Sequence, residues 1–434
     1  MTSSQPRVRS ACSYRLFLSC LLTTVAVPRM VLAEKVIAKG DDWQVYTDGR
    51  VGEFLSWVHG DPAPVAASGE SISGSGWAAR TEPHNDDSAG TVNMMRLRSG
   101  FLGNQLGVGV RGQVTQWTTV TGYVQMWAWV ESDERNKTNI NYADVRQGYA
   151  KLEGPWGSFL AGRTRTLFSR GATDIDVLYG HRWGVGGFGT PNMIQNRGPT
   201  QGMVGFGVMG SGFGAGMIYG TPVIAGLQLN VGIFDPAILG GVGWNGTKYV
   251  RPEAELTFER RFGETGKVVL FADGVYQKIY QTDLCDPSTK LCEETVEGVG
   301  YGGRFEAGPF HLGASGFYGK GLGTSFALEN SYAAADADGR LRWSDGYYVQ
   351  SQVVLRKFDL FAGWGIVRMF LTDLDQKTPA LSVLKHIMGI NAGVVYNMTP
   401  NVHFDLEYFR AEAAWFLGEK QVLNCGAFGL TFNW

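Results

Sequence analysis

Apolar and polar side chains alternate along several segments of this chain, and this period of two is the feature that most constrains its fold. Over residues 250–262, one parity is apolar apart from Arg260, and the other is polar or charged throughout. Residues 227–233, 402–408 and 428–434 repeat the pattern. Successive side chains of a β-strand point to opposite faces, so these segments predict strands with one apolar and one polar face. A soluble β-sandwich would show the same alternation, because one face of each of its sheets contacts water.

The first 33 residues have the composition of a secretory signal peptide. Three basic residues, Arg7, Arg9 and Arg15, precede a mainly apolar run at 16–27, and residues 31–33 (Val-Leu-Ala) offer small side chains where signal peptidase cleaves. We predict cleavage after residue 33. The alternative is a transmembrane anchor, but the run is well short of the ~20 residues that a helix needs to cross a bilayer.

Composition then narrows the class of protein. Removing residues 1–33 takes away four of the 38 Lys and Arg residues and none of the 40 acids, which leaves a formal charge of −6 and argues against a nucleic-acid partner. No later window approaches eighteen consecutive apolar residues, which excludes helical membrane spans. The 61 glycines and 12% aromatic residues suit tight turns and interfacial aromatic girdles. With an export signal, the alternation therefore predicts an all-β protein: a transmembrane antiparallel β-barrel over residues 34–434 in the outer membrane of a Gram-negative cell.

Turn signals divide the barrel region into strands. Short turns are expected at 154–157, 263–266, 307–309 and 399–401. Transmembrane barrels alternate short periplasmic turns with long external loops. Counting the strand-like runs gives about sixteen strands, from Trp43 to the C-terminus. The longer polar stretches between them lie near 60–90, 132–140, 164–200, 236–247, 281–296, 324–342 and 371–385.

Several segments resemble the general porins of enterobacteria. Residues 108–129 resemble that family's second hairpin, with an Arg-Gly pair, a Thr-rich turn and a Gly-Tyr-Val-Gln strand. Residues 144–163 are similar to its next hairpin, with a Gly-Ser-Phe and a terminal Gly-Arg. Residues 218–234 resemble the tyrosine strand and hairpin that follow its constriction loop. Phe432 and Trp434 resemble the aromatic C-terminal signal that the barrel-assembly machinery reads.

The resemblance implies a homotrimer of water-filled barrels in outer-membrane lipid, through which ions and small hydrophilic solutes diffuse. In the family a loop folds into each barrel, and residues 164–200 are the candidate here. Basic wall residues face acidic loop residues, so that charges across a narrow pore create a transverse field. The candidate pore-lining residues are Arg50 and Arg146, which match basic wall positions of the family, with Arg163, Arg96, Arg98, Asp174, Asp176 and Arg182.

The loop departs from the family pattern, and this leaves its selectivity open. Its acids, Asp174 and Asp176, lie early, while Arg182 adds positive charge near its middle. A nearly unselective or weakly anion-preferring pore is therefore expected. Alternatively, the loop charges face bulk water and select nothing. For the wall residues Arg50 and Arg146, the alternative is an ion pair with the neighbouring Asp48 or Asp144.

The remaining chemistry is sparse. Cys285 and Cys292 are predicted to form a disulfide in an oxidising compartment, the alternative being two free thiols. Cys425 is expected to be an inert wall residue. The six histidines show neither metal-binding spacing nor clustering with cysteine, so no metal or other cofactor is predicted.

Other functions remain as alternatives. An eighteen-stranded sugar-type channel would use Trp127 and Trp129 as part of an aromatic slide, although these rings could instead lie at the membrane interface. A structural or adhesive barrel is less favoured. An outer-membrane hydrolase needs Ser and His at the lipid edge, but His403 has the parity of the pore interior. We therefore expect a channel without enzymatic activity.

Overall fold

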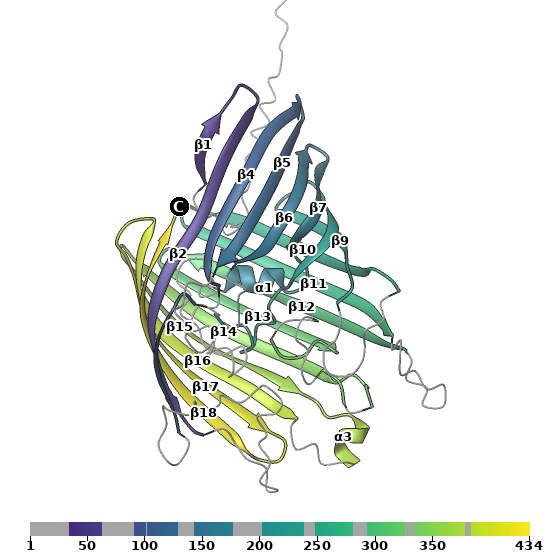
Figure 1. Ribbon diagram of the computed structural model, residues 1–434, viewed down its shortest axis with the longest axis vertical. Helices are drawn as coiled ribbons and strands as arrows, with labels where there is room; N and C mark the ends of the chain where they lie inside the picture. Colours follow the sequence, from purple (N-terminus) through teal and green to yellow (C-terminus); the bar gives the residue numbers. More distant parts are fainter. Residues whose placement is uncertain are drawn as a thin grey trace, which may run out of the picture.

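The described residues form a closed antiparallel β-barrel (Figure 1). Strands that follow one another in sequence pair with one another, and the last, β18 (Lys420–Asn433), pairs with β2 (Trp43–Gly60) to close the ring. None of the helices in the described part of the chain is long and apolar enough to cross a membrane. The computed structural model describes residues 34–62, 91–100, 102–128, 143–176, 202–237, 248–280, 293–325, 328, 334–336, 338–377 and 383–434.

The barrel has sixteen strands, which confirms the prediction. β3 (Val92–Arg98) and β4 (Asn104–Thr115) pair with successive halves of β2 and together make one wall strand. The other wall strands are β5 (Thr118–Ala128), β6 (Ala143–Gly154), β7 (Gly157–Arg165), β8 (Phe213–Gly220), β9 (Leu227–Phe234), β10 (Arg251–Phe262), β11 (Gly266–Tyr280), β12 (Glu293–Ala307), β13 (Phe310–Lys320), β14 (Trp343–Leu355), β15 (Phe358–Met369), β16 (Leu384–Asn397) and β17 (Val402–Trp415).

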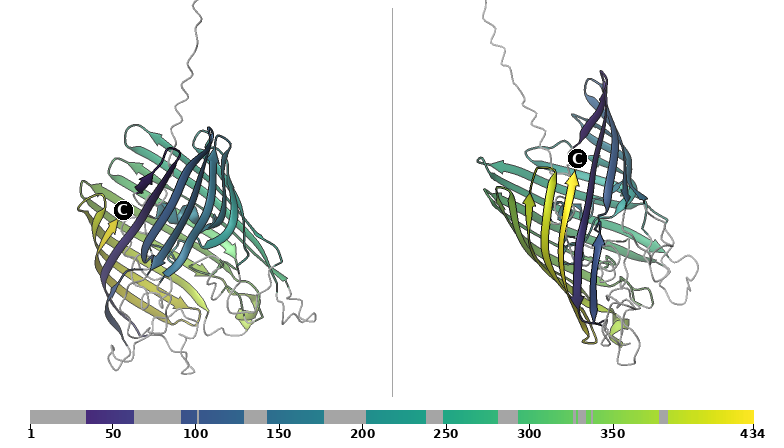
Figure 2. Two further views of the ribbon diagram at one scale, coloured as in Figure 1. Left: turned by 45° about the horizontal axis from the view of Figure 1, so that its top comes forward. Right: turned by 60° about the vertical axis from the view of Figure 1, so that its left-hand side comes forward.

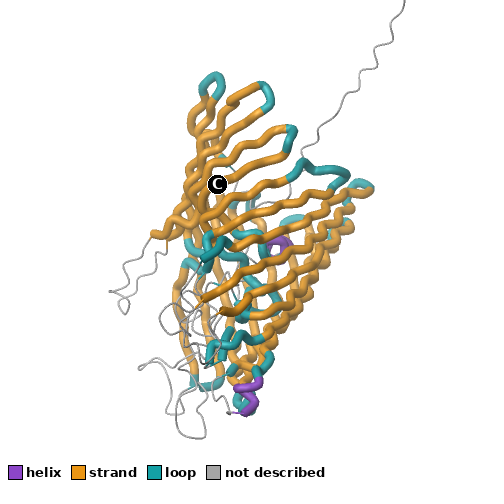
Figure 3. Tube along the Cα trace, turned by 90° about the vertical axis from the view of Figure 1, so that its right-hand side faces the viewer, coloured by secondary structure: helices purple, strands orange, loops and turns teal. Residues whose placement is uncertain are grey.

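Short and long connections segregate to opposite ends of the barrel (Figure 3). The predicted turns at 154–157, 263–266, 307–309 and 399–401 all join paired strands at the end that carries the C-terminus, which is the periplasmic end of such a barrel. The long connections lie at the external end, where α3 (Asp373–Lys377) is found. One external connection, residues 416–419 between β17 and β18, is short and was not predicted as a loop.

The two faces of each strand follow the predicted alternation. On β10, Glu253 and Glu255 point inward and are buried, while Leu256 points outward and is exposed. On β18, Phe428 and Leu430 are exposed on the outer face. Lipid contacts the outer face of a barrel and water or packed side chains fill its interior, so each side chain lies in the environment that suits it.

The external half of the interior is packed rather than open. The connection between β7 and β8 leaves the wall, and its two described stretches, 166–176 and 202–212, lie inside the barrel, with α1 (Arg170–Ile175) in the first stretch (Figure 1). Residues 203–208 pack with apolar side chains of β16–β18 in one cluster. Phe168 and Met209 pack with apolar side chains of β11–β15 in another.

A further strand, β1 (Lys35–Lys39), was not predicted. It pairs with residues 44–47 of β2, next to the point where β18 ends its own pairing with β2 (Figure 2). There β1 covers the edge of β2 that β18 is too short to reach.

Candidate functional site

The chain enters the barrel interior just after β7 through contacts with the inner faces of β10 and β11. The backbone N–H groups of Leu167 and Phe168 donate hydrogen bonds to Oε2 of Glu253, at 2.7 and 2.8 Å. The next N–H, that of Ser169, donates to Oδ2 of Asp273 at 3.1 Å. Two wall carboxylates therefore satisfy three consecutive backbone donors that no strand partner reaches.

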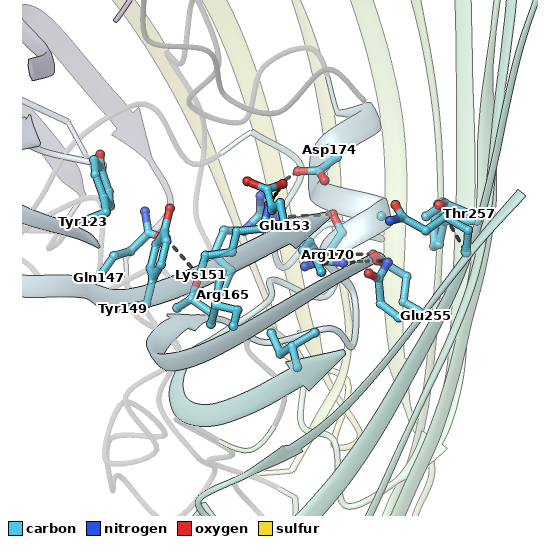
Figure 4. A pocket seen from close by; sticks show the side chains of 18 of the residues that line it. Tyr123, Gln147, Tyr149, Lys151, Glu153, Arg165, Arg170, Asp174, Glu255 and Thr257 are labelled. Carbon is cyan, nitrogen blue, oxygen red and sulfur yellow. Dashed lines mark hydrogen bonds and ion pairs between the residues drawn. The ribbon is translucent and has the colours of Figure 1, made fainter. Parts of the chain in front are cut away.

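α1 follows directly and lies between two ion pairs (Figure 4). On one side, Arg165 at the end of β7 contacts Oδ1 of Asp174 at 2.6 Å. On the other side, Arg170 forms an ion pair with Glu255 of β10, its Nε lying 3.1 Å from Oε1. Charges of both signs therefore extend from the β7 wall, through α1, to the β10 wall.

The returning stretch, residues 202–212, lies against the opposite wall. The Met203 N–H donates to Oδ2 of Asp176 at 2.7 Å, which ties the return to the end of α1. The ring of Phe206 packs edge-on against Phe409 of β17, with centroids 4.9 Å apart. Gly365 of β15 lies under the Phe206 carbonyl so closely that a Cβ there would overlap it. The stretch is thus held by close packing as well as by hydrogen bonds.

The open part of the interior is a polar cavity in the periplasmic half, lined by β2 and β4–β12 and bounded by α1 (Figure 4). The described residues that line it include five Lys or Arg and seven Asp or Glu side chains. Each of the five bases is paired with an acid. The pairs are Arg111–Glu34, Lys151–Glu153, Arg304–Glu306 and the two at α1.

Tyrosines cover one wall of this cavity. Tyr46, Tyr123 and Tyr149 lie in one row across β2, β5 and β6, with ring centroids 6.3 and 5.5 Å apart. Gly109 of β4 stands between the first two, and its missing side chain leaves room for the Tyr46 ring. The Tyr123 hydroxyl donates to the carboxylate of Asp48 at 2.8 Å. In the described part of the chain, no group of three His, Cys, Asp or Glu side chains could hold a metal ion.

Comparison with known proteins agrees with a barrel that encloses a lumen. A family model described as Gram-negative porin matches residues 42–413, which is most of the chain. The chain belongs to the Gram-negative porins. It forms an outer-membrane channel for the passive diffusion of solutes, which confirms the predicted family, location and function.

Solved porin structures share the fold of this porin at low sequence identity. The outer membrane channel DcaP of Acinetobacter baumannii has a TM-score of 0.65 and 16% identity, over 92% of this chain and 99% of that one. The anion-selective porin from Comamonas acidovorans has a TM-score of 0.57 and 13% identity, over 91% and 100%. OmpF of Salmonella typhi, in complex with daunomycin, has a TM-score of 0.53 and 13% identity, over 92% and 99%. A search of curated proteins found no match.

The two wall arginines predicted from the sequence occupy different settings in the porin. Arg50 is on the inner face of β2, is 1% exposed and interacts electrostatically with Asp405 of β17. It is not among the residues that line the cavity. Arg146 forms an ion pair with Asp144 at 2.8 Å, and its guanidinium lies over the ring of Trp127 at 5.2 Å. The neighbour that was named as the alternative partner of Arg146 is therefore the one it contacts.

Arg163 corrects the sequence-based expectation. It is exposed and has the parity of Phe159 and Ala161, which points outward, whereas Thr164 and Arg165 line the cavity. Gly162 beside it has a φ of 134°, which residues with a side chain rarely adopt. The charge that the sequence assigned to Arg163 is supplied inside the barrel by Arg165.

The other predicted site residues are distributed as follows. Asp174 pairs with Arg165, and Asp176 is fully buried as a backbone acceptor. The backbone of Arg96 and Arg98 lies in β3, opposite Ser56 and Phe54 of β2. The remaining candidates, Arg182, Cys285, Cys292 and Trp129, lie outside the described residues.

At the C-terminus, the predicted assembly residues lie beside β2. Phe432 is exposed on the outer face and its ring stacks on that of Trp434, with centroids 5.7 Å apart. Trp434 exchanges two backbone hydrogen bonds with Gly49, at 2.9 and 3.0 Å. Its ring fills the space that a side chain at Gly49 would need. The last residue thus completes the seam between the first and last wall strands.

Sequence reasoning missed several residues that organise the lumen. Glu253, Glu255 and Asp273 receive the inward chain, and Arg165 and Arg170 pair with acids around α1. The alternation over residues 250–262 did place Glu253 and Glu255 inside. No sequence signal indicated which loop would meet them.

Proposed function

We propose that α1 and its flanking charges form the constriction of this porin, within the predicted loop 164–200. The observation that carries the proposal is the line of two ion pairs, Arg165–Asp174 and Arg170–Glu255, that joins the β7 wall to the β10 wall through α1. Charges in a narrow, partly desolvated pore are weakly screened, so they act strongly on passing ions. Because each of these charges is paired with one of opposite sign, the electric field at the constriction acts only at short range. Ions and small hydrophilic solutes of either charge can therefore pass.

The selectivity we propose is a weak preference for cations. The described lining has seven acidic and five basic side chains, whereas the sequence favoured a weak anion preference or none. Arg50 is buried away from the cavity and Arg163 points outward, so neither contributes a positive charge to the lining. Removing them from the predicted set of pore charges shifts the expected balance toward the acids.

Planar-bilayer recordings test the constriction. Glu255→Gln leaves the Arg170 charge uncompensated and should move the reversal potential in a salt gradient toward the anion, while Arg170→Gln should move it toward the cation. Glu306→Gln is the matched control for the loss of one lining acid: Glu306 also pairs with an arginine but lies one residue from the end of β12, at the periplasmic turn, so it should shift the reversal potential less than Glu255→Gln does. Channels that open normally with an unchanged reversal potential in both constriction variants would refute the role of α1.

We also propose that the functional unit is a homotrimer. The outward side chains of β4–β6 are aliphatic or glycine, including Val108, Val110 and Val124. On β11–β18, by contrast, exposed aromatic side chains are frequent on the outer face, as with Tyr301 and Phe428. Aromatic girdles mark contact with the lipid interface. A wall without them is suited to contact with another subunit, and the rest of the barrel to contact with lipid.

Export and assembly complete the proposal. Residues 1–33 direct export, and the aromatic C-terminus presents the chain to the barrel-assembly machinery. Because Trp434 closes the seam with Gly49, deleting it should leave the chain in the periplasm, as measured by cell fractionation. Normal outer-membrane levels of the shortened chain would contradict this role.

We propose no catalytic role for this porin. His403, the residue that a lipid-edge hydrolase would need on the outer face, is buried inside the barrel and contacts Asn397 at 2.9 Å. Cys425 is buried within the apolar cluster of the external half. The alternative of an eighteen-stranded sugar channel is wrong in its strand number. Trp127, which such a channel would use, points into the barrel, but its ring is 5% exposed and lies under the guanidinium of Arg146.

A further inference from the structure

An apolar groove with a volume of about 720 Å³ crosses the outer face of the barrel from β7 to β12. This volume falls within the range of about 300–1,000 Å³ that is typical of sites for small molecules. The groove lies near the external end, because two of its lining residues, Ile233 and Pro252, are one residue from the ends of β9 and β10 there. Since the outer face of a barrel contacts lipid, the groove opens to hydrocarbon rather than to water.

The middle of the groove is hollow because two neighbouring outward residues are small. Ala254 of β10 and Gly274 of β11 are register partners and both line the groove. On one side lies Val231, the partner of Ala254 on β9, and on the other lies Tyr276, the next outward residue of β11. The larger side chains of these two residues give the hollow side walls, which an evenly covered lipid face lacks.

Packing within the chain does not require a glycine at the bottom of this hollow. Gly274 does not have a positive φ, and among the described residues an added Cβ would meet only the carbonyl oxygen of Gly298, at 3.5 Å, which is an ordinary contact. By contrast, a Cβ at Gly300, on the inner face of β12, would lie 2.4 Å from the carboxylate of Asp273. The room at Gly274 therefore remains on the outer side, where another molecule can use it.

Basic and aromatic side chains lie at the external end of the groove. Lys278 is the outward residue that follows Tyr276 on β11, ~7 Å farther toward the external end. The ammonium group of Lys248 lies 4.5 Å from the ring centroid of Tyr280, which follows Lys278 at the same parity. Both lysines are exposed. Tyrosine and lysine side chains in such a position are typical of the interface where lipid headgroups lie.

The acids near these lysines lie on one side. Glu293 and Glu297 of β12 are the register partners of Tyr280 and Tyr276. Lys248, in contrast, is just before β10, which is on the other side of β11. An anion above the groove is therefore attracted on the β10 side and repelled on the β12 side.

We infer that the groove binds an acyl chain of a phosphate-bearing lipid of the external leaflet, and that Lys248 and Lys278 hold the phosphate. Bulk lipid is as apolar as the groove, so the chain gains no hydrophobic free energy by entering it. Close packing against the side walls and attraction of the phosphate to the two lysines retain the lipid instead. A second subunit fits the groove less well, because exposed aromatic side chains such as Phe159 and Tyr219 line it and mark contact with lipid.

Native mass spectrometry tests the site with phosphatidic acid, which has two acyl chains and a bare phosphate. The porin is reconstituted in phosphatidylcholine vesicles that contain phosphatidic acid, and the lipid that stays bound after transfer to detergent is counted. The wild type should retain phosphatidic acid, and Ala254→Phe, which fills the hollow, should retain several-fold less. Ala362→Phe is the matched control, because Ala362 is an exposed outward residue of β15, away from the groove. Equal retention by Ala254→Phe and the wild type would overturn the inference.

Diacylglycerol with the same acyl chains separates the contribution of the phosphate from that of the chain. Lys248→Gln/Lys278→Gln should lower the retention of phosphatidic acid to that of diacylglycerol and leave the retention of diacylglycerol unchanged. Full retention of phosphatidic acid by this double variant would overturn the assignment of the two lysines. A changed native mass of Ala254→Phe without loss of lipid would make the groove a subunit contact and overturn the inference. Heat-modifiable migration confirms that each variant barrel has folded.

Discussion

The inner surface of this barrel has two halves of different character. In the periplasmic half, inward side chains such as Lys151 and Glu259 are polar and surround an open cavity. In the external half, inward side chains such as Ile387 and Phe409 are apolar and pack against residues 203–208. A porin interior that is polar throughout would leave an inward-folded loop held only by hydrogen bonds that compete with water. Here the apolar half acts as a core that fixes the loop, and the polar half remains for solutes.

The largest expected effect comes from the apolar half. Phe409→Ala removes the ring on which Phe206 packs, and truncating a buried Phe in a protein core costs about 3–5 kcal/mol. The thermal midpoint of the folded barrel should fall markedly and the open-channel current should become noisy. Tyr149→Ala, in the polar half, is the control and should affect both much less. Equal effects of the two variants would remove the distinction between the halves.

The next effect concerns the loops outside the apolar half. Arg342 donates two hydrogen bonds of 2.7 Å to the carboxylate of Asp375, and Thr372 N–H donates a third at 3.0 Å. Loss of one partner of such a buried pair costs about 3 kcal/mol or more, so Asp375→Ala should release the β13–β14 and β15–β16 connections from each other. Limited proteolysis should then cleave these connections sooner, while the barrel remains intact. An unchanged rate of cleavage would mean that the Arg342–Asp375 pair does not hold the two connections together.

The same pair predicts a pH dependence. Burial alone would raise the pKa of Asp375, but the hydrogen bonds from Arg342 and Thr372 outweigh it and hold this pKa below its usual value. A carboxyl with a lowered pKa stabilises the folded state above its unfolded-state pKa, and this stability is lost as the pH falls through the folded-state pKa. Protease resistance of the loops should therefore persist at neutral pH and decline only below about pH 4. A decline in protease resistance near pH 6 would mean that a titratable group other than Asp375 controls the stability of these loops.

An intermediate effect is expected where the inward chain first meets the wall. Glu253→Gln keeps the size of the side chain but removes the charge that accepts hydrogen bonds from Leu167 and Phe168. Hydrogen bonds to a charged acceptor contribute about 1.5–3 kcal/mol, so these two amides should exchange hydrogen faster. Conductance should fluctuate more, and the barrel should also melt at a lower temperature, because the buried Arg251 loses its ion-pair partner 2.8 Å away. A change in melting with no change in amide exchange would place the role of Glu253 in the wall instead.

The smallest effect is expected in the polar half. Tyr123→Phe removes the hydroxyl that donates to Asp48 and should cost about 0.5–1.5 kcal/mol, because water in the cavity can replace it. The mean conductance should stay close to that of the wild type. A loss as large as that of Phe409→Ala would show that the tyrosine wall is as tightly packed as the apolar half.

Strand alternation explains why so much of the fold could be predicted. Residues 250–262 and 428–434 carry a clear signal, interrupted only at Arg260, because one of their faces contacts lipid and the other is polar. The apolar half was not predicted, since the alternation reverses its polarity at the external end of β17: Ala411 and Ala413 point inward, while the charged Arg410 and Glu412 alternate with them. The residues of the functional site were harder to predict than the fold. α1 has only six residues, too few for a helical period, and its partner Glu255 is 85 residues from Arg170.

Finally, β1 has a consequence for the periplasmic end of the folded barrel. β18 stops at Asn433, so residues 44–47 of β2 would otherwise present unpaired N–H and C=O groups to the periplasm. Such an open edge recruits strands from other molecules and leads to aggregation. The strand Lys35–Lys39 pairs with that edge and satisfies its backbone hydrogen bonds. The lysines at the two ends of β1 then disfavour the addition of a further strand. The first short strand of the chain thus protects the porin from its own copies.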